Sequence, residues 1–263
     1  MYANGQRKIA LNLWYSDLSQ DGSLADSAIY GHLVNSKSGR LLPQHETNLK
    51  SLLNDIVTRG FNEIIFRFAT QGDSDPRGWT NWDESKYLNN RSFIETTITT
   101  VEDQLKGKPI KIFYDLDMEL GGTDDGQSIE YATRLWKDYT DIFGTHHTVG
   151  FSFAVASQRL TTAISLFHKV GKRPDLYAFD IYGDEFNTFA YLKNELEAAG
   201  EASKPIIADE VYYNDPNTFT QILESRNVLH LNIKYLLQWD LARGTPNNKF
   251  AAQYPAAFSA YLN

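Results

Sequence analysis

Residues 204–210 read KPIIADE, and this stretch decides the fold class. A proline opens a short apolar run, and the run ends abruptly in two carboxylates, Asp209 and Glu210. Such a run, rich in isoleucine and bounded by a turn-forming residue, is typical of a strand buried on both faces in a parallel sheet. The two carboxylates then lie at the carboxyl end of that strand, where the chain leaves the sheet.

The same kind of apolar run recurs along the chain and alternates with amphipathic stretches. Strands are predicted at residues 9–14, 64–68, 109–114, 149–155, 176–182, 205–210 and 233–239. Helices are predicted around residues 49–57, 94–105, 129–143, 160–170, 189–199, 219–223 and 250–262. This alternation indicates repeated β-α units around a parallel sheet.

These segments predict an α/β fold, a (β/α)8 TIM barrel that forms a single domain over residues 1–263. The predicted strands are one fewer than the eight that close such a barrel, so we expect one strand to be short or irregular, with residues 28–35 as a candidate. The length agrees, since this domain typically takes roughly 250 residues.

Composition narrows the partners and the chemistry. With 25 basic and 33 acidic residues the net charge is −8, and no basic block is present, so we expect no nucleic-acid partner. No apolar run approaches the ~20 residues of a membrane helix, so we expect no membrane partner. Zero cysteines exclude disulfides and cysteine nucleophiles. The histidines lack metal-ligand spacing and no glycine-rich phosphate loop follows a strand, so we expect no metal or other cofactor.

The start of the sequence bears on localisation. Residues 1–5 lack the charged and apolar regions of a signal peptide. Either the protein stays inside the cell or a leader is absent from this sequence. We expect an extracellular or periplasmic protein, with a cytoplasmic one as the alternative, and the pattern gives no oligomeric state.

The active site of a barrel lies at the carboxyl ends of its strands, so the polar residues there are the candidates. Acidic, basic and aromatic side chains recur at these ends: Arg67, Asp115, Asp117, Asp180, Tyr182, Glu210 and Trp239. This mixture favours a sugar-binding site over ordinary solvated loops.

Arg67 and Glu210 are the central pair of this prediction. Alternation along a strand places Glu210 on one face with Ile206 and Ala208, and Asp209 on the other. Arg67 follows two isoleucines, and a buried guanidinium needs a carboxylate partner. We expect Arg67 to contact Glu210 at the barrel mouth and keep it ionised, the alternative being a purely structural ion pair.

Four segments, taken in order, resemble those of the clan A (β/α)8-barrel glycoside hydrolases. Residues 60–67 (GFNEIIFR) are similar to that clan's second strand, which bears an arginine, and residues 174–182 (PDLYAFDIY) are similar to its sixth strand. Residues 204–210 are similar to its seventh strand, and residues 235–239 (YLLQW) are similar to its eighth. The resemblance implies that Glu210 is the nucleophile, that Arg67 and Tyr182 orient it, and that Trp239 lies under the sugar.

The fourth strand departs from that clan, whose Asn-Glu pair supplies the acid/base. Here residues 150–157 read GFSFAVAS and hold no carboxylate, although glycosidic cleavage ordinarily takes two. The replacement is expected in DLDME, residues 115–119, where Asp115, Asp117 and Glu119 share one face if the strand continues. Crowded carboxylates raise one another's pKa, which suits a proton donor. We predict Asp117 as the acid and Asp115 as the second choice.

Two alternatives remain for the missing acid. In the first, Asp115 only supports a neighbouring group while the other acids of the run are solvated. In the second, the acid comes from Asp184 or Glu185, which follow the Tyr182 strand.

Tryptophans supply a second indication of sugar binding. Trp79 and Trp82 lie in the polar loop after the second strand, and Trp14 ends the first. Flat indole faces suit the apolar faces of sugars, although a loop tryptophan can equally pin its loop to the barrel.

We therefore predict a glycoside hydrolase that acts on a polysaccharide or oligosaccharide. The predicted catalytic residues are Glu210, Asp117 and Asp115, and the predicted substrate-binding residues are Arg67, Tyr182, Trp239, Trp79, Trp82, Trp14 and Asp180. The first alternative is a non-catalytic carbohydrate-binding barrel that lost its acid, and the second is a protein-interaction scaffold.

Overall fold

The computed structural model describes residues 7–17, 34–154, 159–213 and 215–239. Its strands, all paired in parallel, are β1 (Lys8–Ser16), β2 (Val34–Asn35), β3 (Glu63–Thr70), β4 (Lys111–Asp115), β5 (Thr148–Gly150), β6 (Phe153–Ala154), β7 (Tyr177–Asp180), β8 (Ile206–Val211) and β9 (Ile233–Gln238). Each predicted strand is therefore present, with ends shifted by a few residues.

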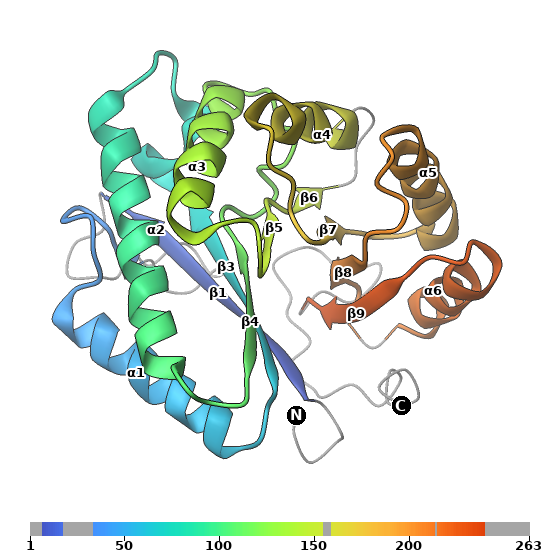
Figure 1. The fold of residues 1–263 in the computed structure, drawn as a ribbon, viewed down its shortest axis with the longest axis horizontal. Helices are drawn as coiled ribbons and strands as arrows, with labels where there is room; N and C mark the ends of the chain where they lie inside the picture. The colour runs from blue at the N-terminus through green and yellow to red at the C-terminus, as the bar shows by residue number, and fades with distance from the viewer. Residues whose placement is uncertain (1–6, 18–33, 155–158, 214, 240–263) are drawn as a thin grey trace.

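The helices pack around the outside of the strands, from α1 on the left of Figure 1 to α6 on the right. They are α1 (Pro43–Thr58), α2 (Glu84–Leu105), α3 (Ser128–Phe143), α4 (Arg159–Val170), α5 (Glu185–Ala198) and α6 (Pro216–Val228), with the short 3₁₀ turns η2 (Gly72–Ser74) and η3 (Pro76–Gly78) before α2. Their starts follow capping chemistry, since Asp83 and Asp215 accept hydrogen bonds from the first-turn N–H groups of α2 and α6. The predicted helix at residues 250–262 lies outside the described residues.

The strands form two sheets, in the orders β2-β1-β3-β4-β5 and β6-β7-β8-β9. The predicted fourth strand is split into β5 and β6, and no hydrogen-bonded ladder joins the two sheets within the described ranges. Of the predicted candidate at residues 28–35, only Val34–Asn35 is described, and it pairs with β1. The fold is thus of the barrel type, α/β with one irregular strand position, as predicted.

One detail corrects the strand numbering that the resemblance implies. β6 pairs directly with β7, so the described chain has no strand between the fourth position and the strand that leads to Tyr182. That strand therefore occupies the fifth place in order, and the glutamate-bearing β8 the sixth.

Apolar side chains pack on both faces of the strands, in an outer layer against the helices and in an inner layer inside the barrel. Residues such as Ile64, Phe66 and Ile206 face the helices and belong to the larger core. A smaller inner cluster takes residues from successive strands, with Leu237 packed against it: Ile65, Phe113, Val149, Leu176, Ala178 and Ile207. Burial of each large apolar side chain stabilises the fold by roughly 1.5–3 kcal/mol. Because the inner layer fills the interior, the residues next along each strand form the floor of the mouth.

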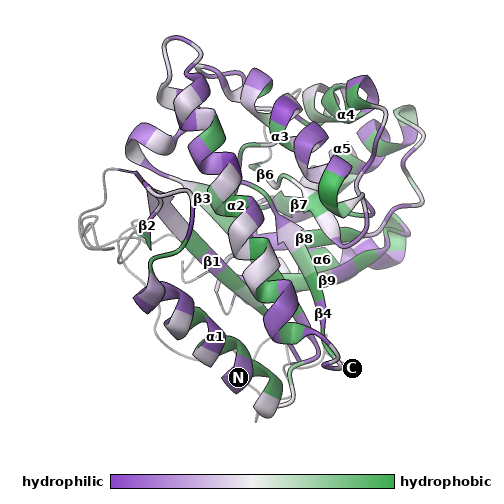
Figure 2. Ribbon diagram, turned by 60° about the vertical axis from the view of Figure 1, so that its left-hand side comes forward, coloured by the Kyte–Doolittle hydropathy of each residue, from purple (hydrophilic) through white to green (hydrophobic). Residues whose placement is uncertain are grey.

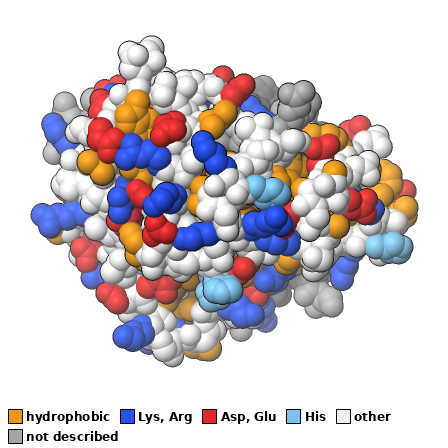
Figure 3. Space-filling view, turned by 45° about the horizontal axis from the view of Figure 1, so that its top comes forward, with side chains coloured by type: hydrophobic (Ala, Val, Ile, Leu, Met, Phe, Trp, Pro, Cys, Tyr) orange, Lys and Arg blue, Asp and Glu red, His pale blue; other side chains and the backbone are white. Residues whose placement is uncertain are grey.

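The outer surface is mixed in character. The helices carry hydrophobic residues alongside hydrophilic ones, as expected for elements that rest one face on a sheet (Figure 2). On the face shown in Figure 3, acidic and basic side chains are interspersed and neither sign forms a large patch. Within the described ranges no helix is both long and apolar enough to cross a bilayer.

Candidate active site

Arg67 lies at the centre of the barrel mouth. It follows Ile65 on the inward face of β3, and its side chain is only 1% exposed. Its Nη1 donates to Glu210 Oε1 at 2.8 Å, which confirms the predicted contact between these two residues. Three further carboxylates pair with the same guanidinium, namely those of Asp209 at 2.9 Å, Asp180 at 3.3 Å and Asp115 at 3.4 Å.

Glu210 is held at both of its oxygens. Tyr182, which follows β7, donates its hydroxyl to Glu210 Oε2 at 2.7 Å, while Arg67 holds Oε1. Burial, and then the Glu210 carboxylate, raise the pKa of Tyr182, so the phenol remains a donor. Among the four acids on Arg67, the side chain of Glu210 is 9% exposed and the other three are at most 1% exposed. Glu210 is therefore the one that a substrate can reach.

The orientation predicted for Asp209 is wrong. Ile206 and Ala208 face the helices and Ile207 faces inward, so simple alternation would place Asp209 inside and Glu210 outside. Both reach Arg67, because the pairing of β8 with β7 shifts by one residue at Asp209. Such a β-bulge re-aims the residues around it, and it turns Glu210 into the mouth as well.

The cluster around Arg67 contains more negative than positive charge. Four carboxylates against one guanidinium would leave a net −3 if all were ionised. Burial raises the pKa of Asp115, Asp180 and Asp209, and Glu210 raises that of Asp180 further. Asp180 Oδ2 is also buried without a hydrogen-bond donor in the described part of the chain. We infer that the cluster holds at least one proton at neutral pH.

Burial lowers the pKa of Arg67, but the carboxylates, Asp209 first, raise it well above its usual value. Arg67 therefore remains the fixed positive charge of the mouth.

Asp115 lies behind Arg67. Its carboxylate accepts from the Ser152 N–H at 3.0 Å and pairs with Arg67, and it is fully buried. This placement suits a residue that supports the guanidinium, the alternative weighed for it from the sequence.

Asp117 lies on a different side of the chain from Asp115, so the expectation that the acids of DLDME share a face is wrong. β4 ends at Asp115, and the strand period no longer applies beyond it. The Asp117 carboxylate is buried and accepts from the Thr70 N–H at 3.2 Å and from the Thr70 hydroxyl at 2.7 Å. Burial raises the pKa of Asp117 to about 7 in spite of Arg77.

Glu119 is the acid of this run that faces Glu210, although the sequence pattern favoured its neighbours. One oxygen each of Glu119, Asp180 and Glu210 lie within 4.8 Å of one another. The φ angle of Glu119 is 57°, a left-handed conformation that costs a non-glycine residue about 1–2 kcal/mol. Strained backbone of this kind concentrates at functional sites. The features of the sequence that could have indicated Glu119 are its carboxylate and the two glycines just after it, Gly121 and Gly122.

The same three acids form the one group in the described chain whose oxygens could converge on a metal ion. Arg67 already hydrogen-bonds to Asp180 and Glu210 and supplies the positive charge that a cation would bring. The donor set therefore fits carboxyl chemistry better than metal binding.

Two predicted sugar-binding tryptophans lie at the mouth. Trp14 pairs in register with Ala69, two residues beyond Arg67, so it lies on the inward face of β1. Trp239 follows β9 two residues after Leu237, and its N–H donates to the Val211 carbonyl at 3.0 Å, next to Glu210. Both residues are half-buried.

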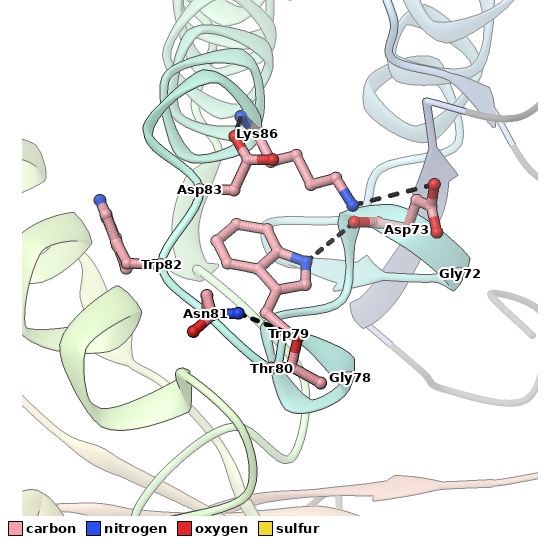
Figure 4. A pocket seen from close by; sticks show the side chains of 9 residues that line it. All are labelled: Gly72, Asp73, Gly78, Trp79, Thr80, Asn81, Trp82, Asp83 and Lys86. Carbon is pink, nitrogen blue, oxygen red and sulfur yellow. Dashed lines mark hydrogen bonds and ion pairs between the residues drawn. The ribbon is translucent and has the colours of Figure 1, made fainter.

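Trp79 and Trp82 lie away from this group. They line a pocket of about 300 Å³ formed by the loop after β3 and the start of α2 (Figure 4). Trp79 is 5% exposed and its indole N–H donates to the Asp73 carbonyl at 2.8 Å. Arg134 lies over the Trp82 ring at 4.8 Å. These contacts are the ones expected of rings that pin the loop, the alternative weighed for them from the sequence, and the predicted sugar-binding role of both rings stays a prediction.

The reserve candidates Asp184 and Glu185 have local partners. Asp184 accepts from the Asn187 amide, and the buried Glu185 accepts from the Thr218 hydroxyl at 2.6 Å. The Asp184 contact lies at the start of α5, and the Glu185 contact joins the starts of α5 and α6.

No protein-family model matches the chain, and no curated protein matches it in sequence. Solved structures match its fold. It is similar to a glucosidase from Croceicoccus marinus (TM-score 0.56, 11% identity, over 90% of this chain and 54% of that one) and to an exo-β-1,4-mannosidase from Opitutaceae bacterium strain TAV5 (TM-score 0.56, 12% identity, over 100% and 53%). It is also similar to the GH53 catalytic domain from Ignisphaera aggregans (TM-score 0.55, 13% identity, over 89% and 74%).

The chain thus has the fold of the barrel glycoside hydrolases, and the predicted resemblance to clan A is confirmed at the level of the fold. It spans about half the length of the first two of these proteins. At this level of identity the matches establish the fold, and the chemistry has to be inferred from the site.

Proposed function

We propose that the protein is a glycoside hydrolase whose reaction takes place at Glu210. The observation that carries this proposal is the carboxylate itself, fixed at one oxygen by Arg67 and at the other by Tyr182 in the mouth of a barrel, where it is the most exposed of the four acids on Arg67. Positioned in this way, a carboxylate is suited to attack an anomeric carbon or to stabilise positive charge there.

The spacing of acids supports cleavage over simple binding. Glycosidic hydrolysis takes two carboxyl groups, about 5–5.5 Å apart for retention of configuration and about 6.5–9.5 Å apart for inversion. One oxygen of Glu119 and one of Asp180 lie within 4.8 Å of an oxygen of Glu210, which is nearer to the shorter range than to the longer one. We therefore propose a retaining reaction, in which Glu210 forms a glycosyl ester that water then hydrolyses.

The sugars to test are chosen from proteins of similar fold. A glucosidase and an exo-β-1,4-mannosidase share the fold, so glucans and β-1,4-mannans are the first substrates to test. We assign the apolar faces for the sugar rings to Trp14, on the β1 strand next to Arg67, and to Trp239, at the end of β9.

One observation favours a second function, a carbohydrate-binding barrel without catalysis. The fourth strand position carries Ser152 in place of an acid, and the sequence offers no carboxylate in residues 150–157. Such a protein would bind glycans at the same mouth and release no product.

A comparison of product release and binding separates the two functions. Wild type, Glu210→Gln and Glu130→Gln are incubated with β-1,4-mannan and with glucans, and new reducing ends are measured. Wild type and Glu130→Gln, whose changed residue is exposed on α3, should cleave equally, whereas Glu210→Gln should release nothing. Glycan binding by the wild type without any release of reducing ends would contradict hydrolysis and support the binding barrel.

A further inference from the structure

We propose that Glu119 is the proton donor of this site, in place of the acid that the fourth strand lacks. The inference rests on the proposed hydrolase function and assigns the second carboxyl group. Glu119 and Asp180 both bring an oxygen within 4.8 Å of Glu210. Asp180 is 1% exposed and paired with Arg67, so a substrate cannot reach it, and Glu119 is the remaining member of the group.

Exposure along the loop singles out the same residue. From Asp115 to Gly121 every residue is buried except Glu119. Leu116, Met118 and Leu120 are buried, and Asp117 is turned toward Thr70. A proton donor has to touch the glycosidic oxygen, and only Glu119 in this stretch has a side chain open to the mouth.

The backbone around Glu119 is anchored to the neighbouring strands. Its own N–H donates to the Ser152 hydroxyl at 3.0 Å, and the Met118 N–H donates to the Phe68 carbonyl at 2.8 Å. The Gly121 N–H donates to the Ser152 carbonyl at 2.9 Å, and a Cβ at Gly121 would lie 2.6 Å from that oxygen. The fourth strand position, which holds no carboxylate, therefore supplies Ser152, and Ser152 positions the acid of the adjacent loop.

The charges around Glu119 come from five elements. Glu210 on β8 and Asp180 on β7 are acidic neighbours, and Arg67 on β3, Arg77 on η3 and Arg159 on α4 are basic ones. Burial, followed by Glu210, raises the pKa of Glu119 against the opposing effect of the three arginines. The carboxyl group thus keeps its proton to higher pH than an ordinary glutamate, as a general acid requires.

The reaction balances with water as the only co-reactant. Glu119 gives its proton to the glycosidic oxygen as the bond from that oxygen to the anomeric carbon breaks, and the Glu210 carboxylate bonds to that carbon. The Glu119 carboxylate then takes a proton from water, the water oxygen bonds to the anomeric carbon, and Glu210 leaves as a free carboxylate.

The test compares leaving groups in Glu119→Gln. Substrates are mannotetraose and cellotetraose, each with the 2,4-dinitrophenyl β-glycoside of the same sugar, whose leaving group needs little protonation. The rate of tetrasaccharide hydrolysis should fall about 10²–10⁴-fold. The rate at which the aryl glycoside forms the glycosyl ester, measured as the burst of dinitrophenol, should fall less than about tenfold. The alkaline limb of the wild-type kcat/KM profile should disappear in the variant. Asp117→Asn, a matched amide change in the same loop, should affect both substrates equally.

A second variant guards against misfolding. In Glu119→Ala, azide should restore turnover of the aryl glycoside and yield a glycosyl azide, since azide attacks the ester without a general base. Equal losses on both substrates, absence of azide rescue, or the leaving-group pattern in Asp117→Asn would overturn the assignment while hydrolysis itself stands. A wild type that cleaves none of these substrates would overturn the proposed function, and the assignment with it.

Discussion

The loops after β3 and β4 contain similar residue types and do different things. Residues 71–83 and residues 116–127 are both rich in acidic and glycine residues, and both leave the same end of the barrel. The first loop is bonded to β1 at its start, where the Gln71 N–H donates to the Tyr15 carbonyl. Beyond that point it folds on itself through η2 and η3, with Asp75 capping η3 and Trp79 bonded to the Asp73 carbonyl. The second directs its N–H groups to Phe68 and to Ser152. Only the second loop brings an acid to Glu210.

We infer from this difference that the points at which a loop's backbone is bonded to the barrel, more than the loop's composition, determine which of its side chains lies at the mouth. A side chain on a loop that bonds to the barrel strands is fixed relative to them, and fixed geometry is what catalysis needs. A loop that closes on itself can carry the same residues without any relation to the mouth.

The largest expected effect separates the arginines of the two regions. Arg67→Met leaves four buried carboxylates without their cation, so the free energy of unfolding should fall by about 3–5 kcal/mol. Arg77→Met removes a partly exposed pair with Asp75 in the first loop and should cost less than about 1 kcal/mol. Urea denaturation at pH 7 measures both. Equal losses would contradict the view that Arg67 holds the mouth together.

A pair of glycines tests the anchoring directly. In Gly121→Ala the new Cβ would lie 2.6 Å from the Ser152 carbonyl, so the loop must move, at a cost of about 1–3 kcal/mol and with a loss of hydrolysis. A Cβ added at Gly78 in the first loop would meet no atom of a non-adjacent residue within 4 Å, and Gly78→Ala should leave activity unchanged. Thermal unfolding and product release are measured together. Full activity in Gly121→Ala would show that the second loop is not held where catalysis requires it.

Asp117 gives a pH dependence of stability. Its pKa is raised to about 7 in the folded protein from an ordinary value of 3.8, so the folded state holds the proton more tightly than the unfolded state does. The stabilisation is therefore complete below about pH 4 and is lost as the pH rises toward 7, with a slope of at most about 1.4 kcal/mol per pH unit. The difference between wild type and Asp117→Asn, measured by urea denaturation from pH 4 to 8, isolates this residue. A difference that does not change with pH would contradict it.

The smallest effect concerns the tryptophans. Trp239→Ala should weaken glycan binding by about tenfold, because it removes an apolar face beside Glu210. Trp82→Ala removes a ring that packs under Arg134 and should lower thermal stability while leaving affinity unchanged. Calorimetric titration with mannotetraose or cellotetraose measures the affinities. A larger loss of affinity in Trp82→Ala would move the sugar path to the first loop.

Much of the architecture could be predicted from the sequence because each strand is a short apolar run with a polar end. The contact of Arg67 with Glu210 followed from the same reasoning, since a buried guanidinium needs a carboxylate. Two features could not be predicted in this way. The bulge at Asp209 shifts the register of β8, and β4 ends at Asp115, beyond which a period of two places no side chain correctly. Both depend on pairing with neighbouring strands, which is invisible in a single run of residues.

The most direct test of the central claim is a mass measurement on the glycosyl ester. Glu119→Gln is mixed with the 2,4-dinitrophenyl β-glycoside of the sugar that the wild type cleaves, and the digested protein is analysed by mass spectrometry. With this leaving group, formation of the ester needs no acid, whereas hydrolysis of the ester needs a base. The ester should therefore accumulate, with one glycosyl unit on the peptide that contains Glu210. An unmodified protein after the substrate is consumed, or a glycosyl unit on another carboxylate such as Asp180, would contradict the account.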